Sequence, residues 1–399
     1  MYIRQEIILS FEEIEKVSPP TKLELILSQI DLNDAMSKLE SQDVRTGPRG
    51  YCKRAMLYAV IARIAEKIPT IKALCDRLRD DARFRYNCGF DPYQPPPSQA
   101  TFTRFMKQLE ETGIADLLFQ QQRDKAMELG LIQKENVSID ATHVEAYEQA
   151  VPRSKCAKDD NAPSWSVKIN TEGNQIFWYG WKVHVACDAV SGLPVAMMEA
   201  PAHIHDSQMA IHLINQIPYD PKAYIMDKGY DASEIYEYIV REKGALAIIP
   251  INKRGSQAPP SGMTDDYQPM CSGGFPLTYW GKDGDKLKFR CPHVMGKVDC
   301  PHGSAWCSNS DYGYTLKVNV KENPRLYPGL PRNSKRFKEL SNLRSSVERC
   351  NHRFKNHVML ESLRSSGRKA AGTHFKLCAT VLLAGTIAVN QIDMLAKAA

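Results

Sequence analysis

Residues 225–231 read IMDKGYD, and this stretch decides the fold because it joins an apolar strand to a helix through a tight turn. The run 223–226 is short and apolar, as in a buried strand, and Gly229 permits a sharp turn. Asp227 therefore stands where the predicted strand ends. Because residues at such strand ends often carry out the chemistry of an α/β domain, Asp227 is a candidate catalytic residue.

Asp231, four residues later, has a structural explanation instead. It opens the helical sequence DASEIYEYI, and Glu234 follows it by three residues, which is the capping-box pattern. We expect Asp231 to accept a backbone N–H at the start of its own helix and to stay out of any catalytic cluster.

A second aspartate stands in a setting similar to that of Asp227. In SIDAT (138–142), Asp140 follows an apolar residue within a predicted strand. If the two strands are neighbours in a mixed sheet, the two carboxylates meet at one end of it. A lone aspartate in a strand is usually a turn or edge residue, but two matched ones in one sheet indicate a shared site.

The third candidate carboxylate is Glu348, within ELSNLRSSVERCNHRFKNHV (339–358), whose apolar residues recur at helical spacing. On a single helix, Arg344, Glu348 and Lys355 lie within roughly 40° of one another, on the flank of the buried stripe. A surface ion pair between Arg344 and Glu348 explains the same spacing without any catalytic role.

The periodicity of the whole chain predicts a mixed α/β (α+β) protein. Residues 1–130 have helical patterns at 51–67, 70–84 and 101–130, with Ser98 as an N-cap. Strands are expected at 136–144, 177–188, 193–203, 223–227 and 246–251, with helices at 206–217 and 231–244. We therefore predict a helical, DNA-binding domain (1–130), a catalytic core in two parts (131–251 and 334–399) and an insertion between them (252–333). A plain helical bundle explains the first segment almost as well.

Charge and composition indicate the kind of partner. The chain has a net charge of +6, whereas residues 321–369 alone contain 13 Lys and Arg against four Glu, which gives +9. A basic stretch beside catalytic carboxylates favours a polyanion such as nucleic acid, although a solvated basic face has the same composition. The start of the chain lacks a secretion signal, and the apolar run 377–389 is too short for a bilayer, so we expect a cytoplasmic protein without a membrane partner.

The insertion is rich in cysteine. The segment RCPHVMGKVDCPHGSAWC (290–307) contains Cys291, Cys300 and Cys307, with Cys-Pro-His written twice. These three thiols are candidate Zn²⁺ ligands, with Cys271, His293 or His302 as the fourth. The spacing is not that of a paired C-x2-C site, so buried thiols without a metal are the alternative.

Three carboxylates are also what two-metal phosphoryl chemistry needs, because Mg²⁺ prefers oxygen ligands and two such ions lie about 4 Å apart. At this point the sequence resembles the DDE transposases of bacterial insertion sequences. One subgroup carries its third carboxylate in a Tyr-x2-Arg-x3-Glu-x6-Lys signature, which Arg344, Glu348 and Lys355 match, while Ser341 takes the place of the tyrosine. The stretches DKGYD, AHIHDS (202–207) and 47–109 also resemble segments of this family.

The resemblance implies a ribonuclease-H-like catalytic domain in which Asp140, Asp227 and Glu348 hold two Mg²⁺ ions, with Mn²⁺ as a substitute. It implies cleavage of double-stranded DNA at terminal inverted repeats and strand transfer into target DNA. We also expect a homodimer on DNA, in the bacterial nucleoid. A metal-dependent nuclease of the same fold and a DNA-binding descendant that no longer cuts are the alternatives.

Overall fold

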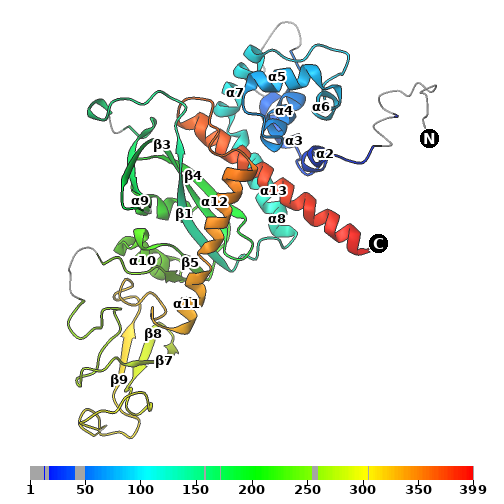
Figure 1. Ribbon diagram of the computed structural model, residues 1–399. Helices are drawn as coiled ribbons and strands as arrows, with labels where there is room; N and C mark the ends of the chain where they lie inside the picture. The colour runs from blue at the N-terminus through cyan, green and yellow to red at the C-terminus, as the bar shows by residue number, and fades with distance from the viewer. Residues whose placement is uncertain are drawn as a thin grey trace. The chain divides into compact units, whose positions relative to one another are not determined.

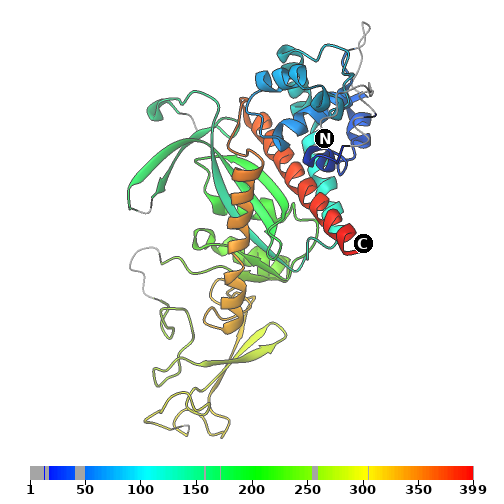
Figure 2. The same cartoon turned by 45° about the vertical axis from the view of Figure 1, so that its right-hand side comes forward.

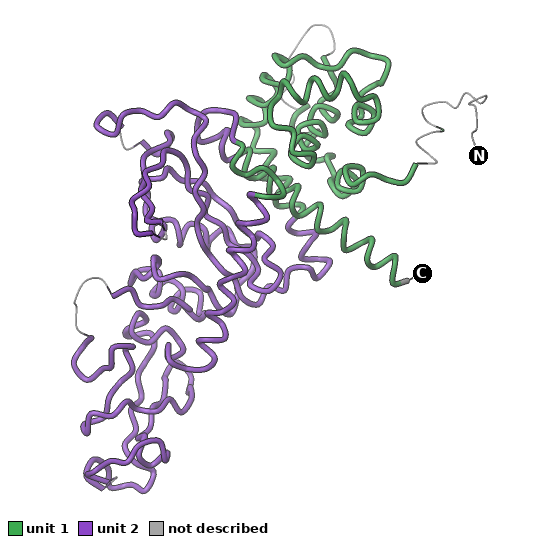
Figure 3. The backbone as a smooth tube through the Cα atoms, in the orientation of Figure 1, with its two compact units in different colours: residues 1–122, 356–362, 373–399 green, residues 123–355, 363–372 purple. Residues whose placement is uncertain are grey.

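The computed structural model describes residues 13, 18–40, 50–156, 159–170, 172–253, 259–303 and 305–398 (Figure 1). The chain forms two compact units (Figure 3). The first contains residues 1–122, 356–362 and 373–399, and the second contains residues 123–355 and 363–372. The domain boundaries at 130, 251 and 333 were derived from sequence pattern and stay predictions.

The first unit consists of short helices, as the periodicity of the N-terminal segment predicts. α2 begins with a capping box in which the side chains of Thr21 and Glu24 accept each other's backbone N–H. Ser98 caps α7 by accepting the N–H of Thr101 at 3.3 Å, which confirms the predicted cap. The helices are α2 (Lys22–Leu27), α3 (Asn33–Glu40), α4 (Lys53–Ala65), α5 (Ile71–Asp80), α6 (Ala82–Asn87), α7 (Gln99–Thr112) and α8 (Ile114–Glu128), of which α8 continues into the second unit.

Two of the helical stretches expected from sequence are each divided by one residue. Asp81 ends α5 with an extended backbone, and its side chain accepts the N–H of Phe84 to begin α6. Gly113 ends α7 with a left-handed φ of +64°, which only glycine adopts at little cost. The predictions of continuous helices over 70–84 and 101–130 are therefore wrong at these two positions.

The second unit is built around a mixed six-stranded sheet. Its strands are β1 (Asn136–Glu145), β2 (Ser164–Ile169), β3 (Gln175–Asp188), β4 (Pro194–Pro201), β5 (Ala223–Ile225) and β6 (Leu246–Ile248). The order is β2-β3-β1-β5-β6, and β4 pairs with the second half of β3. β1, β5 and β6 run parallel, whereas β3 is antiparallel to its neighbours. The sequence pattern did not predict β2, whose last residues are exposed.

Helices follow the strands in the predicted order. α9 (Asp206–Ile214) precedes β5, and α10 (Ser233–Glu237) leads into a π-helical turn (Tyr238–Glu242) before β6. After the insertion come α11 (Lys335–Asn342), α12 (Ser345–His357) and α13 (Arg368–Ala398). Figure 2 shows α11 and α12 in succession, with a break between them.

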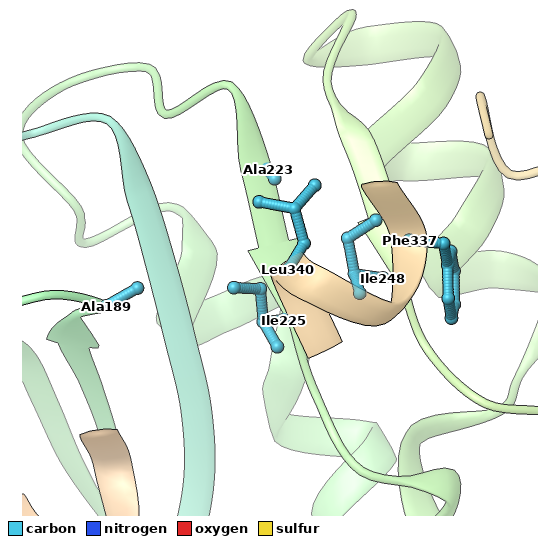
Figure 4. Close-up of a cluster of buried hydrophobic side chains, with 6 residues drawn as sticks. All are labelled: Ala189, Ala223, Ile225, Ile248, Phe337 and Leu340. Carbon is cyan, nitrogen blue, oxygen red and sulfur yellow. The ribbon is translucent and has the colours of Figure 1, made fainter. Parts of the chain in front are cut away.

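The parallel part of the sheet is covered by α11. A buried cluster joins this helix to β5 and β6 (Figure 4). Its members are all apolar and come from four separate segments: Ala189, Ala223, Ile225, Ile248, Phe337 and Leu340. The packing of Leu340 against Ile225 places the end of α11 on the face of the sheet to which Ile225 points, which is the face of the catalytic candidates described below.

The insertion forms a second, smaller sheet. β7 (Thr278–Asp283), β8 (Lys286–Arg290) and β9 (Thr315–Asn319) pair antiparallel in the order β7-β8-β9. The 24 residues between β8 and β9 contain turns but no helix or strand among those described. A three-stranded sheet of this size buries little apolar surface by itself.

The C-terminal helix α13 is long and apolar. By length and composition it is the one helix of the described residues that could cross a membrane, but 61% of its most apolar window is buried within the structure. Core helices of globular proteins pass the same test. The predicted burial of the run 377–389 holds at nearly every position, with Val389 exposed.

Candidate active site

Asp140, in β1, and Asp227, two residues past the end of β5, lie at the same level of two neighbouring parallel strands. β1 and β5 are paired in a register that sets Ser138 opposite Ile225. Asp140 follows Ser138 by two residues and Asp227 follows Ile225 by two, with Asp227 still in extended conformation. Because side chains alternate along a strand, both carboxylates point to the face of the sheet that carries Ser138 and Ile225. Neighbouring strands are about 4.8 Å apart, so the two side chains are close neighbours.

The helix that carries Glu348 is attached to this same face. Ser138 Oγ donates to the carbonyl of Leu343 at 3.2 Å, and Ser346 Oγ donates to Ser138 Oγ at 3.0 Å. Ser138 belongs to β1, whereas Leu343 and Ser346 lie at the junction of α11 and α12. Ser138 and Ser346 are fully buried. The sheet thus holds the start of α12 beside Asp140.

The structure corrects the expected single helix over 339–358. α11 ends at Asn342 and α12 begins at Ser345, so Arg344 stands in the break rather than within a helix. The N–H groups of Ser346 and Val347 bond to carbonyls three residues back, which tightens the chain at this point. The predicted buried stripe is nevertheless present, because Val347, Cys350 and Phe354 are fully buried.

Burial dominates the electrostatics of Asp140. The pKa of this carboxyl is raised to about 7, chiefly by burial and in addition by the negative charges of Asp227 and Asp206. A backbone hydrogen bond from Ala141 and the charge of Arg344 act in the opposite direction. Asp140 is therefore surrounded by two other carboxylates and one guanidinium, an arrangement that a bound cation would stabilise in the ionised form.

Asp206 and Tyr230 are neighbours of this site that the sequence reasoning did not select. Asp206 begins α9 and pairs with Lys182 of β3 at 2.9 Å. The hydroxyl of Tyr230 is buried without a hydrogen-bond partner in the described part of the chain. Burial raises its pKa well above the usual value, and the charges of Asp206, Asp140 and Asp227 add to this effect. The only sequence signal was indirect, since Asp206 lies in AHIHDS and Tyr230 in DKGYD.

Glu348 takes part in an ion pair. Its carboxylate lies 2.8 Å from the guanidinium of Arg344, four residues earlier, and its side chain is half exposed. This is the ion pair that the spacing allowed as an alternative to a catalytic role. Arg344 lies within electrostatic reach of both Glu348 and Asp140 and so links the two carboxylates. Lys355 lies seven residues after Glu348 on α12, close to the same face of the helix.

Asp231 does not cap α10, so that prediction is wrong. The N-cap position belongs to Ala232, which has no side-chain capping bond. The side chain of Asp231 is fully buried and accepts two hydrogen bonds from Arg325, at 2.7 and 2.9 Å, and one from the N–H of Asn252. Asp231 forms an ion pair rather than a cap because Arg325, 94 positions away in the sequence, lies beside it in the fold. A local sequence pattern does not include that residue. Asp231 does stay out of the group around Asp140.

Comparisons with known proteins identify the family. Residues 133–384, well over half of the chain, match the model described as "Transposase DDE domain". The chain belongs to the DDE transposase family. Residues 11–108 match a second model, "Transposase domain (DUF772)". No curated protein matches the chain.

A solved structure described as "Cryo-EM structure of piggyBac transposase synaptic complex with hairpin DNA (SNHP)" is similar to the chain at 11% identity. Its TM-score is 0.38, and the match covers 93% of this chain and 75% of that one.

Family membership confirms several expectations about this transposase. A DDE domain has a ribonuclease-H-like fold, and the mixed sheet flanked by helices agrees with it. DDE transposases act on DNA, cleave it and transfer strands, and they use divalent metal ions. The family match covers Glu348 but does not by itself show the subgroup signature around it.

The donor set around Asp140 fits a hard divalent cation. Asp140 and Asp227 offer carboxylate oxygens from adjacent segments of the sheet, and burial together with the charge of Asp227 disfavours the ionised form of Asp140 without a cation. Among the residues that the structure describes, no three carboxylate, His or Cys side chains are already arranged to hold a metal ion. Glu348 as the third ligand of the transposase, and Cys291, Cys300 and Cys307 as zinc ligands, therefore stay predictions.

Ser341, at the signature position of tyrosine, lies on α11 and lines a cavity of about 600 Å³. Arg332, Asn333, Lys338 and Asn342 line it as well. None of the candidate catalytic carboxylates lines this cavity. It lies apart from them, where the core meets the insertion.

Proposed function

We propose that this transposase cuts DNA at the terminal inverted repeats of an insertion sequence and joins the freed ends to target DNA. Asp140, Asp227 and Glu348 are the proposed ligands of two Mg²⁺ ions, for which Mn²⁺ can substitute. The observation that carries the assignment is the register of β1 and β5, which sets the two aspartates at one level. The bonds of Ser138 to the start of α12 support the inclusion of Glu348.

The proposed reaction consists of two phosphoryl transfers. In the first, a water oxygen bonds to phosphorus while the bond to the 3′-oxygen breaks, which leaves a 3′-hydroxyl and a 5′-phosphate. In the second, that hydroxyl attacks a phosphodiester of the target, and one P–O bond forms for each one broken. Divalent ions supply the charge that activates the attacking oxygen and stabilises the leaving oxygen.

The residues of the chain contribute position and charge. Asp140 presents its oxygens from within β1, and Asp227 follows β5 by two residues, where the N–H of Gly229 donates to its Oδ1 at 2.8 Å. Arg344 balances the negative charge near Asp140 and, with Lys355, is the proposed contact for the phosphates around the scissile bond. Ser346 keeps α12 on the sheet, which makes it a positioning residue.

The remaining parts of the proposal concern DNA and assembly. We assign DNA binding to the helical N-terminal segment, residues 1–130, in which α7 presents the exposed residues Arg104 and Lys107. Because an insertion sequence has two ends, a homodimer on DNA accounts for their joint processing. Cytoplasmic location, at the bacterial nucleoid, follows from the DNA substrate.

Replacement of Glu348 by Gln tests the assignment. The change keeps shape and removes the charge that a metal ligand needs. We expect cleavage and strand transfer of a labelled element end in Mg²⁺ to fall by at least about 100-fold, as for loss of a single stabilising group in other active sites. DNA affinity should remain, because it depends on many Lys and Arg contacts to phosphate.

Glu339→Gln is the matched control. Glu339 is an exposed glutamate of α11, paired with Arg336 at 3.5 Å, and it lies outside the proposed site. It should keep full cleavage activity. If Glu348→Gln behaved like this control and lost only a few tenths of a kcal/mol of stability, Glu348 would be merely the ion-pair partner of Arg344.

The same assay separates the alternative functions. Cleavage without strand transfer in the wild-type protein would indicate a nuclease. DNA binding without either reaction, in Mg²⁺ and in Mn²⁺, would indicate a DNA-binding descendant.

A further inference from the structure

Four of the eleven cysteines of the chain lie within the insertion, at positions 271, 291, 300 and 307. None of the four is part of a disulfide bond. They come from three separate segments: the loop before β7, the end of β8, and the irregular stretch between β8 and β9.

Cys271 and Cys300 lie on either side of Gly273. A β-carbon at position 273 would lie 3.8 Å from Cys271 Sγ and 3.7 Å from Cys300 Sγ. One methyl group would therefore be in van der Waals contact with both sulfurs. The two residues are 29 positions apart in the sequence, so their approach is a product of the fold.

The same two cysteines begin turns of the same construction. The N–H of Gly274 donates to the carbonyl of Cys271 at 3.0 Å, and the N–H of Gly303 donates to the carbonyl of Cys300 at 3.0 Å. Both turns close on a glycine with positive φ, +79° at Gly274 and +64° at Gly303. Each turn thus has a cysteine at its first position and a glycine at its fourth.

Cys291 and Cys307 complete the group. The N–H of Cys291 donates to the carbonyl of Tyr314 at 2.8 Å, which anchors Cys291 between the end of β8 and the start of β9. The thiols of Cys291, Cys271 and Cys300 all lie within electrostatic reach of the Cys307 thiol.

We propose that the insertion binds one Zn²⁺ ion through the four thiolates of Cys271, Cys291, Cys300 and Cys307. Soft sulfur ligands favour zinc over magnesium, and a structural zinc site has four ligands in a tetrahedron with Zn–S distances of about 2.3 Å. The described side chains do not form such a group without a metal, so zinc binding has to bring the four sulfurs closer together. The proposal is independent of the carboxylate site and of the reaction assigned to it.

The neighbouring histidines are engaged in other contacts. His293 Nδ1 accepts the N–H of Cys300 at 3.2 Å, and the ring of His302 stacks on Trp306 with centroids 4.5 Å apart. We take Cys271 as the fourth ligand because its sulfur and that of Cys300 lie on either side of Gly273.

The small size of the insertion also favours a metal site. Its sheet has strands of six, five and five residues, and the stretch between β8 and β9 has no helix or strand among its described residues. Small domains of this kind lack the buried apolar area to hold long irregular segments, and a metal supplies the missing free energy. The four ligands would tie the loop before β7 and the stretch after β8 to one point.

The test begins with the zinc content of the full-length protein, purified under reducing conditions and measured by inductively coupled plasma mass spectrometry. We expect about one zinc per chain, the occupancy of a closed structural site. After replacement of zinc by Co²⁺, the visible spectrum should show the intense d–d bands of tetrahedral cobalt and the charge-transfer bands of thiolate ligands. These two measurements need no variant and do not depend on how well a variant folds.

Single Cys→Ser variants at 271, 291, 300 and 307 should each lower the zinc content at least tenfold. Cys52→Ser and Cys156→Ser, at non-buried cysteines outside the insertion, are matched controls and should keep one zinc. His293→Ala and His302→Ala should also keep it. Asp140→Asn should keep the zinc while it loses cleavage, so failure of the zinc site and failure of the proposed reaction are distinguishable.

Three outcomes would overturn the proposal. The first is wild-type protein that contains no zinc and gives no thiolate–cobalt bands when the metal-free, reduced chain is titrated with Co²⁺. The second is zinc that survives replacement of any one of the four cysteines. The third is zinc that is lost with His293→Ala or His302→Ala, which would replace the four-cysteine site with a mixed one.

Discussion

The hydroxyl of Ser346, in the first turn of α12, donates a hydrogen bond of 3.0 Å to the hydroxyl of Ser138 on β1. Ser138 in turn donates to the carbonyl of Leu343. These buried contacts join residues more than 200 positions apart and align the helix of Glu348 with the strand of Asp140. They make the spacing between the two carboxylates a property of the fold rather than of flexible loops.

Ser346→Ala tests this attachment. Loss of one buried hydrogen bond should lower the free energy of unfolding by about 1 kcal/mol. Cleavage should fall by about tenfold, less than the hundredfold cost of a 1 Å misplacement, because Ser138 keeps its bond to Leu343. Chemical denaturation and a cleavage assay measure the two effects. Ser345→Ala removes the neighbouring, exposed hydroxyl and should change neither; equal losses in both variants would show that Ser346 has no positioning role.

The pKa of Asp140 should respond in opposite directions to two substitutions in the metal-free protein. Asp227→Asn removes a negative charge and should lower it from about 7, whereas Arg344→Gln removes a positive charge and should raise it. Carbon-13 NMR titration of the aspartate carboxyl groups measures both changes. A pKa that stays the same in Asp227→Asn would contradict the adjacency of the two aspartates.

The same shift predicts the sign of a pH effect on stability. The folded pKa of about 7 lies above the unfolded value of about 3.9, so Asp140 favours folding when it is protonated. Its contribution is fully present below about pH 4 and is lost as the pH rises through about 7. The free energy of unfolding of the wild type minus that of Asp140→Asn, measured as a function of pH, should show this loss. Mg²⁺ should make the loss smaller, because it stabilises the ionised form of Asp140.

Arg325→Ala should destabilise the second unit. The change removes the guanidinium that pairs with the fully buried carboxylate of Asp231, and loss of one partner of an enclosed ion pair costs about 3–5 kcal/mol. Because Arg325 is partly exposed, we expect about 2–3 kcal/mol of lost unfolding free energy in urea, after allowance for solvent screening.

Addition of Asp231→Asn to that variant should restore part of the lost unfolding free energy, since it removes the buried negative charge. Lys321→Ala is the control, because its pair with Asp285 is exposed and should contribute little to stability. Equal costs for Arg325 and Lys321 would show that burial of Asp231 is unimportant.

Arg104→Ala combined with Lys107→Ala tests DNA binding by the N-terminal helices. If each side chain contacts one phosphate, the slope of log K against log salt concentration should become shallower by about 2. Fluorescence anisotropy with an element end at several salt concentrations measures the slope. Lys22→Ala with Lys72→Ala removes the same charge from exposed positions of α2 and α5, and an equal change there would indicate a general charge effect rather than contact by α7.

The sequence by itself determined the features that repeat along the chain. Apolar alternation and helical periodicity located β1, β3, β4 and the buried stripe of α12, because these patterns depend only on residues close together in the sequence. The two aspartates that follow apolar strand residues, together with the Arg-x3-Glu-x6-Lys spacing, were sufficient to indicate the DDE transposase family, which the family model confirms.

Only the tertiary structure decided which side chains meet. The local pattern around Asp231 favours a helix cap, but Arg325, 94 residues away, gives its buried carboxylate a charged partner instead. Asp206 joins the charges around Asp140 through the packing of α9, and Cys271 joins the other three cysteines through the fold of the insertion. Contacts of this kind depend on the distance between residues in space, whereas periodicity reports only on residues a few positions apart. For that reason the sequence could name the two aspartates, and only the register of β1 and β5 could set them side by side.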